Sequence, residues 1–197
     1  MKHLVVATRN KGKILEINAL LAGLVDQISC AADFTDFPET IEDGTTFEEN
    51  ALKKAREASN YSGLPALADD SGLVVDALDG RPGVFSARYA GAGGDDAANN
   101  ARLLDECLSV PDGQRQAAFI CVLAFVTPGG IEQLFTGRVS GRILSVPAGE
   151  GGFGYDPLFL VDGFGRSMAE LTLEEKNSVS HRALAFKKFH DYLKMMK

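Results

Sequence analysis

The 197-residue sequence contains no tryptophan, only three cysteines and only three histidines. The cysteines, Cys30, Cys107 and Cys121, are odd in number and widely separated, so they define neither a disulfide framework nor a thiolate metal site. We expect reduced thiols in or near the core. With so few histidines, carboxylates remain the most plentiful side chains that could hold a metal ion.

Long apolar runs are also missing. No stretch approaches the roughly 18 apolar residues of a membrane span. The apolar start at residues 4–7 is far shorter than the roughly 7–15 residues of a signal-peptide core. We therefore expect a cytoplasmic protein with no membrane partner.

The charge balance is acidic, with 27 Asp and Glu against 20 Lys and Arg and a formal net charge of −7. This argues against a nucleic-acid partner, which would require a basic face. It still permits a small anionic substrate, because a metal ion and a few cations can reverse the field locally. The apolar content of 45% is enough for an ordinary core, and the length suits one domain over residues 1–197.

The order of patterns predicts an α/β fold. Residues 4–8 form an apolar run typical of a buried strand, and a helical pattern begins at Ile14. Two strand-like runs, 117–127 and 131–140, flank Pro128-Gly129-Gly130 and predict an antiparallel hairpin. A parallel start and a later hairpin together indicate a mixed β-sheet flanked by helices. Further predicted elements are helices over 46–58 and 97–108, strands over 64–68 and 73–75, a long exposed loop over 79–96, and an amphipathic C-terminal helix that includes Met196.

The segment 8–13 lies where a phosphate-binding loop would lie, between a strand and a helix. Backbone N–H groups at a helix N-terminus attract anions, and Lys13 adds a charge. It is not a Walker A motif, since Ala7 and Ile14 occupy positions that require Gly and Ser or Thr. From the residues alone, a surface turn remains open.

The doublet Asp69-Asp70 follows an apolar strand pattern and precedes Ser71-Gly72. Two adjacent carboxylates repel each other unless a cation compensates, so a Mg²⁺ site is one interpretation. A turn made of turn-forming residues is the other. Glu42 could complete a metal shell or belong to a solvated turn, and Lys54 alone is typical of a solvated helix flank.

The glycine-rich segment 149–157 places Phe153 and Tyr155 among glycines, an arrangement that suits stacking on a nucleobase. His181 and Arg182 open the last helix, and a surface pair is the simpler interpretation of them. No motif for a covalent nucleophile is present. Water activated by a metal ion and a carboxylate fits the residues that are present.

Taken together, these segments resemble the inosine triphosphate pyrophosphatase family, the Ham1-like enzymes that hydrolyse non-standard purine nucleoside triphosphates. The resemblance covers essentially the whole chain through six motifs in order. They lie at residues 7–13, 42–51, 68–72, 82–89, 151–157 and 175–182.

The resemblance implies an elongated sheet, two lobes with an active-site cleft between them, a homodimer, and Mg²⁺ as cofactor. It implies hydrolysis of ITP, dITP and XTP to monophosphate and diphosphate, which keeps these bases out of DNA and RNA. Asp70 would be the general base, and Glu42 and Asp70 would hold Mg²⁺ with Asp69 near or in the same shell. The implied substrate-binding residues are Thr8, Arg9, Asn10, Lys11, Gly12, Lys13 and Lys54 for the triphosphate, Ser71, Phe153, Gly154, Tyr155, Asp156 and Lys176 for the nucleotide, and His181 and Arg182 for the base.

Two other functions remain open at this point. A nucleotide sensor could keep the pocket without hydrolysis, although a pure binder has little use for several carboxylates beside a polyphosphate. An enzyme acting on ordinary dNTPs or on another phosphoanhydride is the second alternative.

Overall fold

The structure of the chain is a computed structural model that describes residues 1–91 and 94–195. Within these residues six strands form one sheet in the order β2-β1-β3-β4-β5-β6. Strand β1 runs parallel to β2 and β3, and β5 runs antiparallel to β6. The strands are β1 (His3–Val6), β2 (Gln27–Cys30), β3 (Ala66–Val75), β4 (Gln116–Val126), β5 (Glu132–Ile143) and β6 (Phe159–Val161). The α-helices are α1 (Lys11–Leu21), α2 (Phe47–Ser62), α3 (Asp96–Glu106), α4 (Leu173–Val179) and α5 (His181–Met195).

Strands β4 and β5 form the hairpin that the sequence predicts. They are neighbours in the sheet, and the turn between them is closed by a hydrogen bond from Gly130 N–H to the Thr127 carbonyl. A parallel pair would need a crossover of a dozen or more residues, so this short connection makes the pair antiparallel. The parallel strands near the N-terminus and this hairpin confirm the predicted mixed sheet flanked by helices.

The chain divides into two compact units. The first comprises Met1–Asp70, Cys121–Gly137 and Arg182–Lys197, and the second comprises Ser71–Ile120 and Arg138–His181. The cleft implied by the family resemblance stays a prediction.

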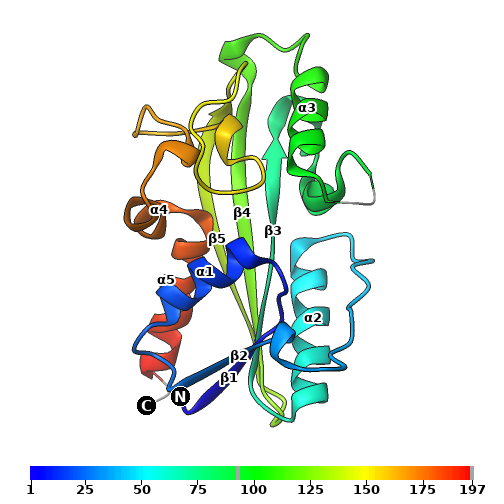
Figure 1. The fold of residues 1–197 in the computed structure, drawn as a ribbon, viewed down its shortest axis with the longest axis vertical. Coiled ribbons are helices and arrows are strands. Elements are labelled where there is room, and N and C mark those ends of the chain that lie inside the picture. Colours follow the sequence, from blue (N-terminus) through cyan, green and yellow to red (C-terminus); the bar gives the residue numbers. More distant parts are fainter. Residues whose placement is uncertain (92–93, 196–197) are drawn as a thin grey trace. The chain divides into compact units, whose positions relative to one another are not determined.

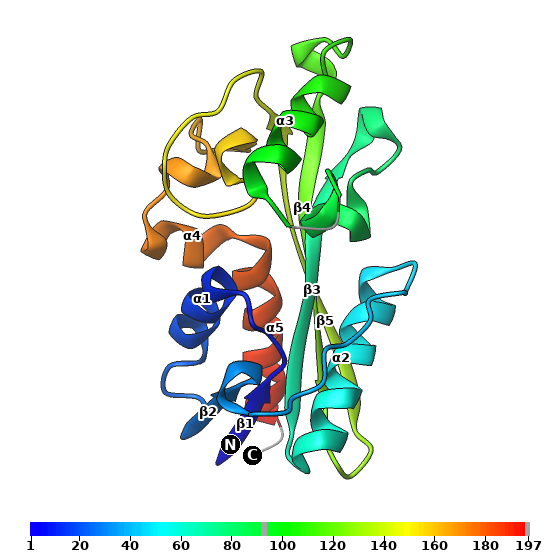
Figure 2. The ribbon, with the colours of Figure 1, turned by 45° about the vertical axis from the view of Figure 1, so that its right-hand side comes forward.

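The first unit has helices on two faces of its strands. Helices α1 and α5 lie together on one face (Figure 1), where Leu67 of β3 joins an apolar cluster with Ile17 and Phe189. Helix α2 lies on the other face (Figure 2), where Ala66 of β3 packs in a cluster with Ala58. Successive residues of β3 therefore face different helices, as the period-two alternation of a strand requires.

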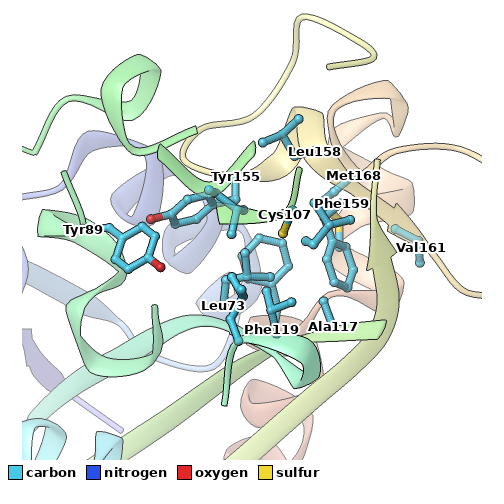
Figure 3. Close-up of a cluster of buried hydrophobic side chains, with 14 of the residues drawn as sticks. Leu73, Tyr89, Cys107, Ala117, Phe119, Tyr155, Leu158, Phe159, Val161 and Met168 are labelled. Carbon is cyan, nitrogen blue, oxygen red and sulfur yellow. The ribbon is translucent and has the colours of Figure 1, made fainter. Parts of the chain in front are cut away.

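The second unit has its own apolar core, shown in Figure 3. Leu73 from β3, Phe119 from β4 and Phe159 from β6 meet Cys107, which follows α3. Tyr155 from the glycine-rich segment is part of the same cluster.

Local sequence signals explain where the site-bearing helices begin. Thr46 accepts a hydrogen bond from Glu49 N–H, and the Glu49 side chain accepts one from Thr46 N–H, which forms a capping box at the start of α2. The same helix is capped at its C-terminus by Gly63, whose φ of 66° lies in the left-handed region that glycine tolerates. Helix α1 begins after Asn10, whose side chain accepts a hydrogen bond from Lys13 N–H. Among the described helices, none combines the length and the apolar character needed to cross a bilayer.

The prediction that the Asp69-Asp70 doublet interrupts a strand is wrong. Strand β3 continues through it without a break from Ala66 to Val75. The reason is electrostatic: side chains from neighbouring helices pair with both carboxylates, so the strand can carry them through the interior. A turn is therefore excluded at this position.

The predicted loop over 79–96 is more ordered and more buried than expected. It contains a short 3₁₀ helix, Gly83–Arg88. The hydroxyl of Ser86 accepts a hydrogen bond of 2.9 Å from Leu73 N–H, and Tyr89 is buried in the core of the second unit. Residues 92–93 of this stretch, like Met196 in the C-terminal pattern, lie outside the described residues.

Candidate active site

Asp69 and Asp70 point to opposite faces of β3. Asp69 shares the face of Leu67, which packs against α1 and α5, whereas Asp70 shares the face of Ala66, which packs against α2. The two carboxylates, adjacent in sequence, therefore belong to different side-chain networks.

On the first face, Asp69 belongs to a buried ion network. Its carboxylate lies 3.0 Å from Lys13 Nζ and accepts a hydrogen bond of 3.1 Å from Arg182 Nη2. Arg182 also donates to Glu16 of α1. Burial alone would raise the pKa of Asp69, but the charges of Lys13 and Arg182 outweigh it and hold that pKa well below its usual range. Asp69 is thus a fixed negative charge between two cations.

On the second face, the ammonium of Lys54 bridges two carboxylates. Its Nζ atom lies 2.9 Å from Glu42 Oε1 and 2.8 Å from Asp70 Oδ1. Burial alone would lower the pKa of Lys54, but the negative charges of Asp70 and Glu42 raise it above its usual value, so the side chain stays charged. The interpretation of Lys54 as a solvated lysine is wrong, because these two carboxylates draw it into the interior.

The Glu42–Asp70 pair has the chemistry of a cation site. Two hard carboxylate oxygens converge on one positive charge, and Mg²⁺ is commonly held by one or two carboxylates together with water and substrate phosphate. The described residues contain no cluster of three or more His, Cys, Asp or Glu side chains suited to a metal ion. The pair therefore fits Mg²⁺ but not a metal held by protein ligands alone. Asp69, on the opposite face of β3, pairs with Lys13 and Arg182, and its charge also acts on Lys54.

The segment 8–13 is held by its own side chains. Thr8 Oγ1 accepts a hydrogen bond of 3.2 Å from Asn10 N–H, and Arg9 donates one of 2.7 Å to the Phe37 carbonyl. Asn10 caps α1, which leaves Lys13 in the first turn with its ammonium directed to Asp69. Lys11 is exposed and Gly12 is half-buried. This arrangement keeps a positive charge and helix N–H groups at one end of α1.

In the second unit, Asp156 and Lys176 form a buried ion pair with an Nζ–Oδ2 distance of 2.6 Å. Asp156 also accepts a hydrogen bond of 3.0 Å from Phe153 N–H. The Lys176 ammonium lies 4.7 Å from the centroid of the Phe153 ring. These contacts fix the Phe153 ring against a cation, which suits it to stacking.

Tyr155 does not lie where the stacking interpretation puts it. It is buried, and its hydroxyl donates a hydrogen bond of 2.8 Å to the Ser86 carbonyl. Because an aromatic ring next to glycine can also fill a core, the sequence could not distinguish the two roles. Of the two aromatic residues, Phe153 remains the candidate for stacking on a ligand.

The interpretation of His181 and Arg182 as a surface pair is also wrong, since both are buried. The His181 ring stacks on Phe119 with a centroid distance of 4.8 Å and an interplanar angle of 15°. Ser71 follows Asp70 in β3 and is half-buried.

Several polar residues around these networks were not predicted from the sequence as part of the site. Glu16 and Asn50 lie on the inward faces of α1 and α2 at helical spacing from Lys13 and Lys54. That spacing was readable, because a polar residue within an inward stripe signals a buried partner. Asp96 and Asn100 of α3, which bond to the backbone of Gly154, had no comparable signal because their partner is 54 or more residues away.

The chain is similar to known proteins over nearly its whole length. The Ham1 family model matches residues 4–192. A Geobacter sulfurreducens protein named dITP/XTP pyrophosphatase is 61% identical over 193 residues, which are 98% of this chain and 97% of that protein. A Geobacillus kaustophilus protein of the same name is 50% identical and spans 97% of this chain and 94% of its own length.

Solved structures of Ham1 proteins are also similar to this chain over nearly its whole length. The structure of a Coxiella burnetii HAM1 protein matches with a TM-score of 0.90 and 40% identity, covering 99% of this chain and 100% of that one. The Staphylococcus aureus Ham1 protein matches with a TM-score of 0.89 and 38% identity, and the match covers both chains completely.

Proposed function

The chain belongs to the Ham1 family, and we propose that it hydrolyses dITP, ITP and XTP to the monophosphate and diphosphate. Relatives named dITP/XTP pyrophosphatase support the substrate class. The observation that carries the proposal is the convergence of Glu42 and Asp70 on a single cation beside a buried β-strand. We infer that the protein thereby removes non-standard purine nucleotides before they enter DNA or RNA.

We propose that Glu42 and Asp70 hold Mg²⁺ when a nucleotide binds. A bound Mg²⁺ ion would neutralise charge on the phosphate oxygens. The carboxylates supply hard oxygen ligands, and Lys54 lies within hydrogen-bond distance of both. The ammonium of Lys54 is then positioned to pair with a phosphate oxygen. The ammonium of Lys13, at the start of α1, could do the same.

The general base is assigned to Asp70. Burial raises the pKa of Asp70 above its usual value in spite of the charge of Lys54, and two donors orient its carboxylate, so it is suited to accept a proton from a water molecule that attacks phosphorus. Asp69 is assigned a different role, that of the charge that holds Lys13 and Arg182 in place. This division follows from the opposite directions of the two side chains.

Selection for a 6-oxo purine is assigned to the start of α5. Arg182 is only 1% exposed and already bonds to the carboxylates of Glu16 in α1 and Asp69 in β3, so its side chain is better placed to connect these two elements than to touch a base. We propose that a donor at this helix start pairs with the 6-oxo acceptor of the base. The 6-amino donor of adenine would leave such a donor unsatisfied, which can reject a substrate by about 10⁴–10⁵-fold.

We further infer that the protein is a cytoplasmic homodimer acting on free nucleotides. The net charge of −7 supports a free nucleotide over a nucleic acid as substrate. Size-exclusion chromatography with light scattering should give twice the mass of one chain.

The substrate class can be tested with a panel of nucleotides in the presence of Mg²⁺. Diphosphate release is expected from dITP, ITP and XTP, with dATP slower by about 10⁴–10⁵-fold for the reason given above. Equal rates on all purines would contradict the selectivity. Binding of dITP without turnover, measured by calorimetry on the same preparation, would indicate a sensor instead of an enzyme.

A second prediction concerns the support of Phe153. Two side chains of α3 hold the Gly154 peptide: Asp96 accepts from its N–H at 2.7 Å, and Asn100 donates to its carbonyl at 2.9 Å. Asn100→Ala removes one of these bonds, so the KM for dITP is expected to rise by about 3–10-fold while kcat stays near the wild-type value. Initial-rate kinetics check this.

The matched control is Asn60→Ala, which changes an exposed asparagine of α2 and should leave both constants unaltered. A fall in kcat without a change in KM for Asn100→Ala would show that the Gly154 segment acts in the chemical step and not in binding.

A further inference from the structure

Asn50 lies in α2 between the two acidic segments of the candidate metal site. It is 0% exposed. Its Nδ2 group donates to Asp70 Oδ2 at 3.3 Å, and its Oδ1 atom accepts from Gly44 N–H at 2.9 Å. One amide group therefore connects the Asp70 carboxylate with the backbone two residues from Glu42.

The segment that carries Glu42, residues 38–46, has no regular secondary structure and lies along α2. Thr40 donates to Glu57 at 2.5 Å, and Lys53 pairs with Asp43 at 2.7 Å. The Lys53–Asp43 contact is exposed and the Thr40–Glu57 contact is only partly buried. Hydrogen bonds and ion pairs in such positions fix the geometry weakly. Asn50, in contrast, fixes the segment from the buried side.

The chemistry of the position requires an amide. Asn50 supplies a donor to a carboxylate and an acceptor to an N–H group at the same time. Aspartate would lack the donor, and leucine would lack both and leave Gly44 N–H without this acceptor.

The packing around Asn50 leaves little room for adjustment. A Cβ atom added to Gly44 would lie 2.6 Å from Asn50 Oδ1 and 2.9 Å from Glu49 Cβ. The absence of a side chain at Gly44 is what lets the segment approach the amide so closely. The position of Asn50 and the path of the segment are thus coupled.

We propose that Asn50 is a positioning residue that sets the orientation of the Asp70 carboxylate and its separation from Glu42, and so prepares the pair to share one divalent cation. This inference rests on the proposed function, because it concerns the same carboxylates. It assigns to Asn50 no contact with substrate or metal.

The second unit contains a buried asparagine that serves as a matched control for Asn50. Asn99 of α3 is 2% exposed, accepts from Ala90 N–H at 2.7 Å and donates to the Ala87 carbonyl at 3.3 Å. It resembles Asn50 in residue type, burial and bridging geometry, but both of its partners are backbone groups. Asn99→Ala should therefore cost comparable stability without acting on a carboxylate.

The experiment compares the wild type with Asn50→Ala, Gly44→Ala and Asn99→Ala. Mn²⁺ binding to the protein in complex with a non-hydrolysable analogue of dITP is measured by electron paramagnetic resonance, and the half-saturating Mg²⁺ concentration is measured for dITP hydrolysis. Loss of an outer partner of a metal ligand is expected to weaken metal binding by about 10–100-fold. We expect this shift for Asn50→Ala, a smaller shift in the same direction for Gly44→Ala, and none for Asn99→Ala.

Circular dichroism and thermal unfolding identify the folded variants. If Asn50→Ala does not fold, Gly44→Ala still tests the inference, since it displaces the amide without removing it. Wild-type metal binding in a folded Asn50→Ala or Gly44→Ala protein would overturn the positioning role, as would an equal shift in Asn99→Ala. A wild type that neither binds Mn²⁺ nor hydrolyses dITP would overturn the proposed function itself, and this outcome is recognised before any variant is compared.

Discussion

Asp70→Asn is expected to abolish turnover of dITP while leaving the protein folded. Asparagine cannot accept a proton from water and is a poorer ligand for Mg²⁺ than a carboxylate. Loss of a general base alone costs about 10²–10⁴-fold in rate, and loss of the metal ligand adds to it. The fold should survive because Lys54 keeps Glu42 as a partner at 2.9 Å. Diphosphate release and circular dichroism measure the two effects.

The matched control for this substitution is Glu132→Gln. Glu132 also pairs with a cation, Arg56, but at the surface, where both side chains are more than one-third exposed. The same carboxylate-to-amide change should leave the rate unaltered there. Near-normal activity of Asp70→Asn would move the general base to another residue and would contradict the division of roles between Asp69 and Asp70.

The largest expected loss of stability comes from Arg182→Met. Arg182 is 1% exposed and connects Asp69 of β3 with Glu16 of α1. Removing the guanidinium leaves two buried carboxylates with one fewer cation, and breaking a buried pair of this kind costs about 3–5 kcal/mol. Urea unfolding followed by circular dichroism gives the change in the free energy of unfolding.

Arg56→Met provides the comparison. Arg56 is 51% exposed and pairs with Glu132 at 2.7 Å, so its loss should cost no more than about 1 kcal/mol. Equal losses in the two variants would show that the Arg182 network is no more important for folding than a surface pair.

The same network predicts an acid dependence. Because Lys13 and Arg182 hold the pKa of Asp69 well below its usual value, the folded state binds fewer protons at this group than the unfolded state. The stabilisation is therefore complete above a pH of about 4, the usual aspartate pKa, and is lost as the pH falls further. The difference in stability between the wild type and Arg182→Met should decrease over that acidic range.

Parts of the fold are predictable because their signals are local. The capping box of Thr46 and Glu49 sets the start of α2 within one residue of the prediction. The Pro128-Gly129-Gly130 turn identifies the β4–β5 hairpin. In both cases, residues a few positions apart contain the information, so periodicity and turn chemistry are sufficient.

The site geometry depends on partners distant in sequence, and there the predictions fail. From the local sequence, Asp69 and Asp70 resemble a turn. The structure shows instead that Lys13 and Arg182 pair with Asp69, and that Lys54 pairs with Asp70. The sequence also gives no sign that Arg182 is buried, because its partner Glu16 lies 166 residues earlier in the chain. No local pattern contains these pairings, since each depends on how the sheet and the helices come together.

The most direct test of the proposed chemistry is the identity of the first phosphorus-containing products. Phosphorus-31 nuclear magnetic resonance can follow dITP hydrolysis by the wild type in the presence of Mg²⁺. Attack that separates the monophosphate from diphosphate predicts dIMP and diphosphate in equal amounts from the earliest time point. Orthophosphate and dIDP as the first products would contradict it.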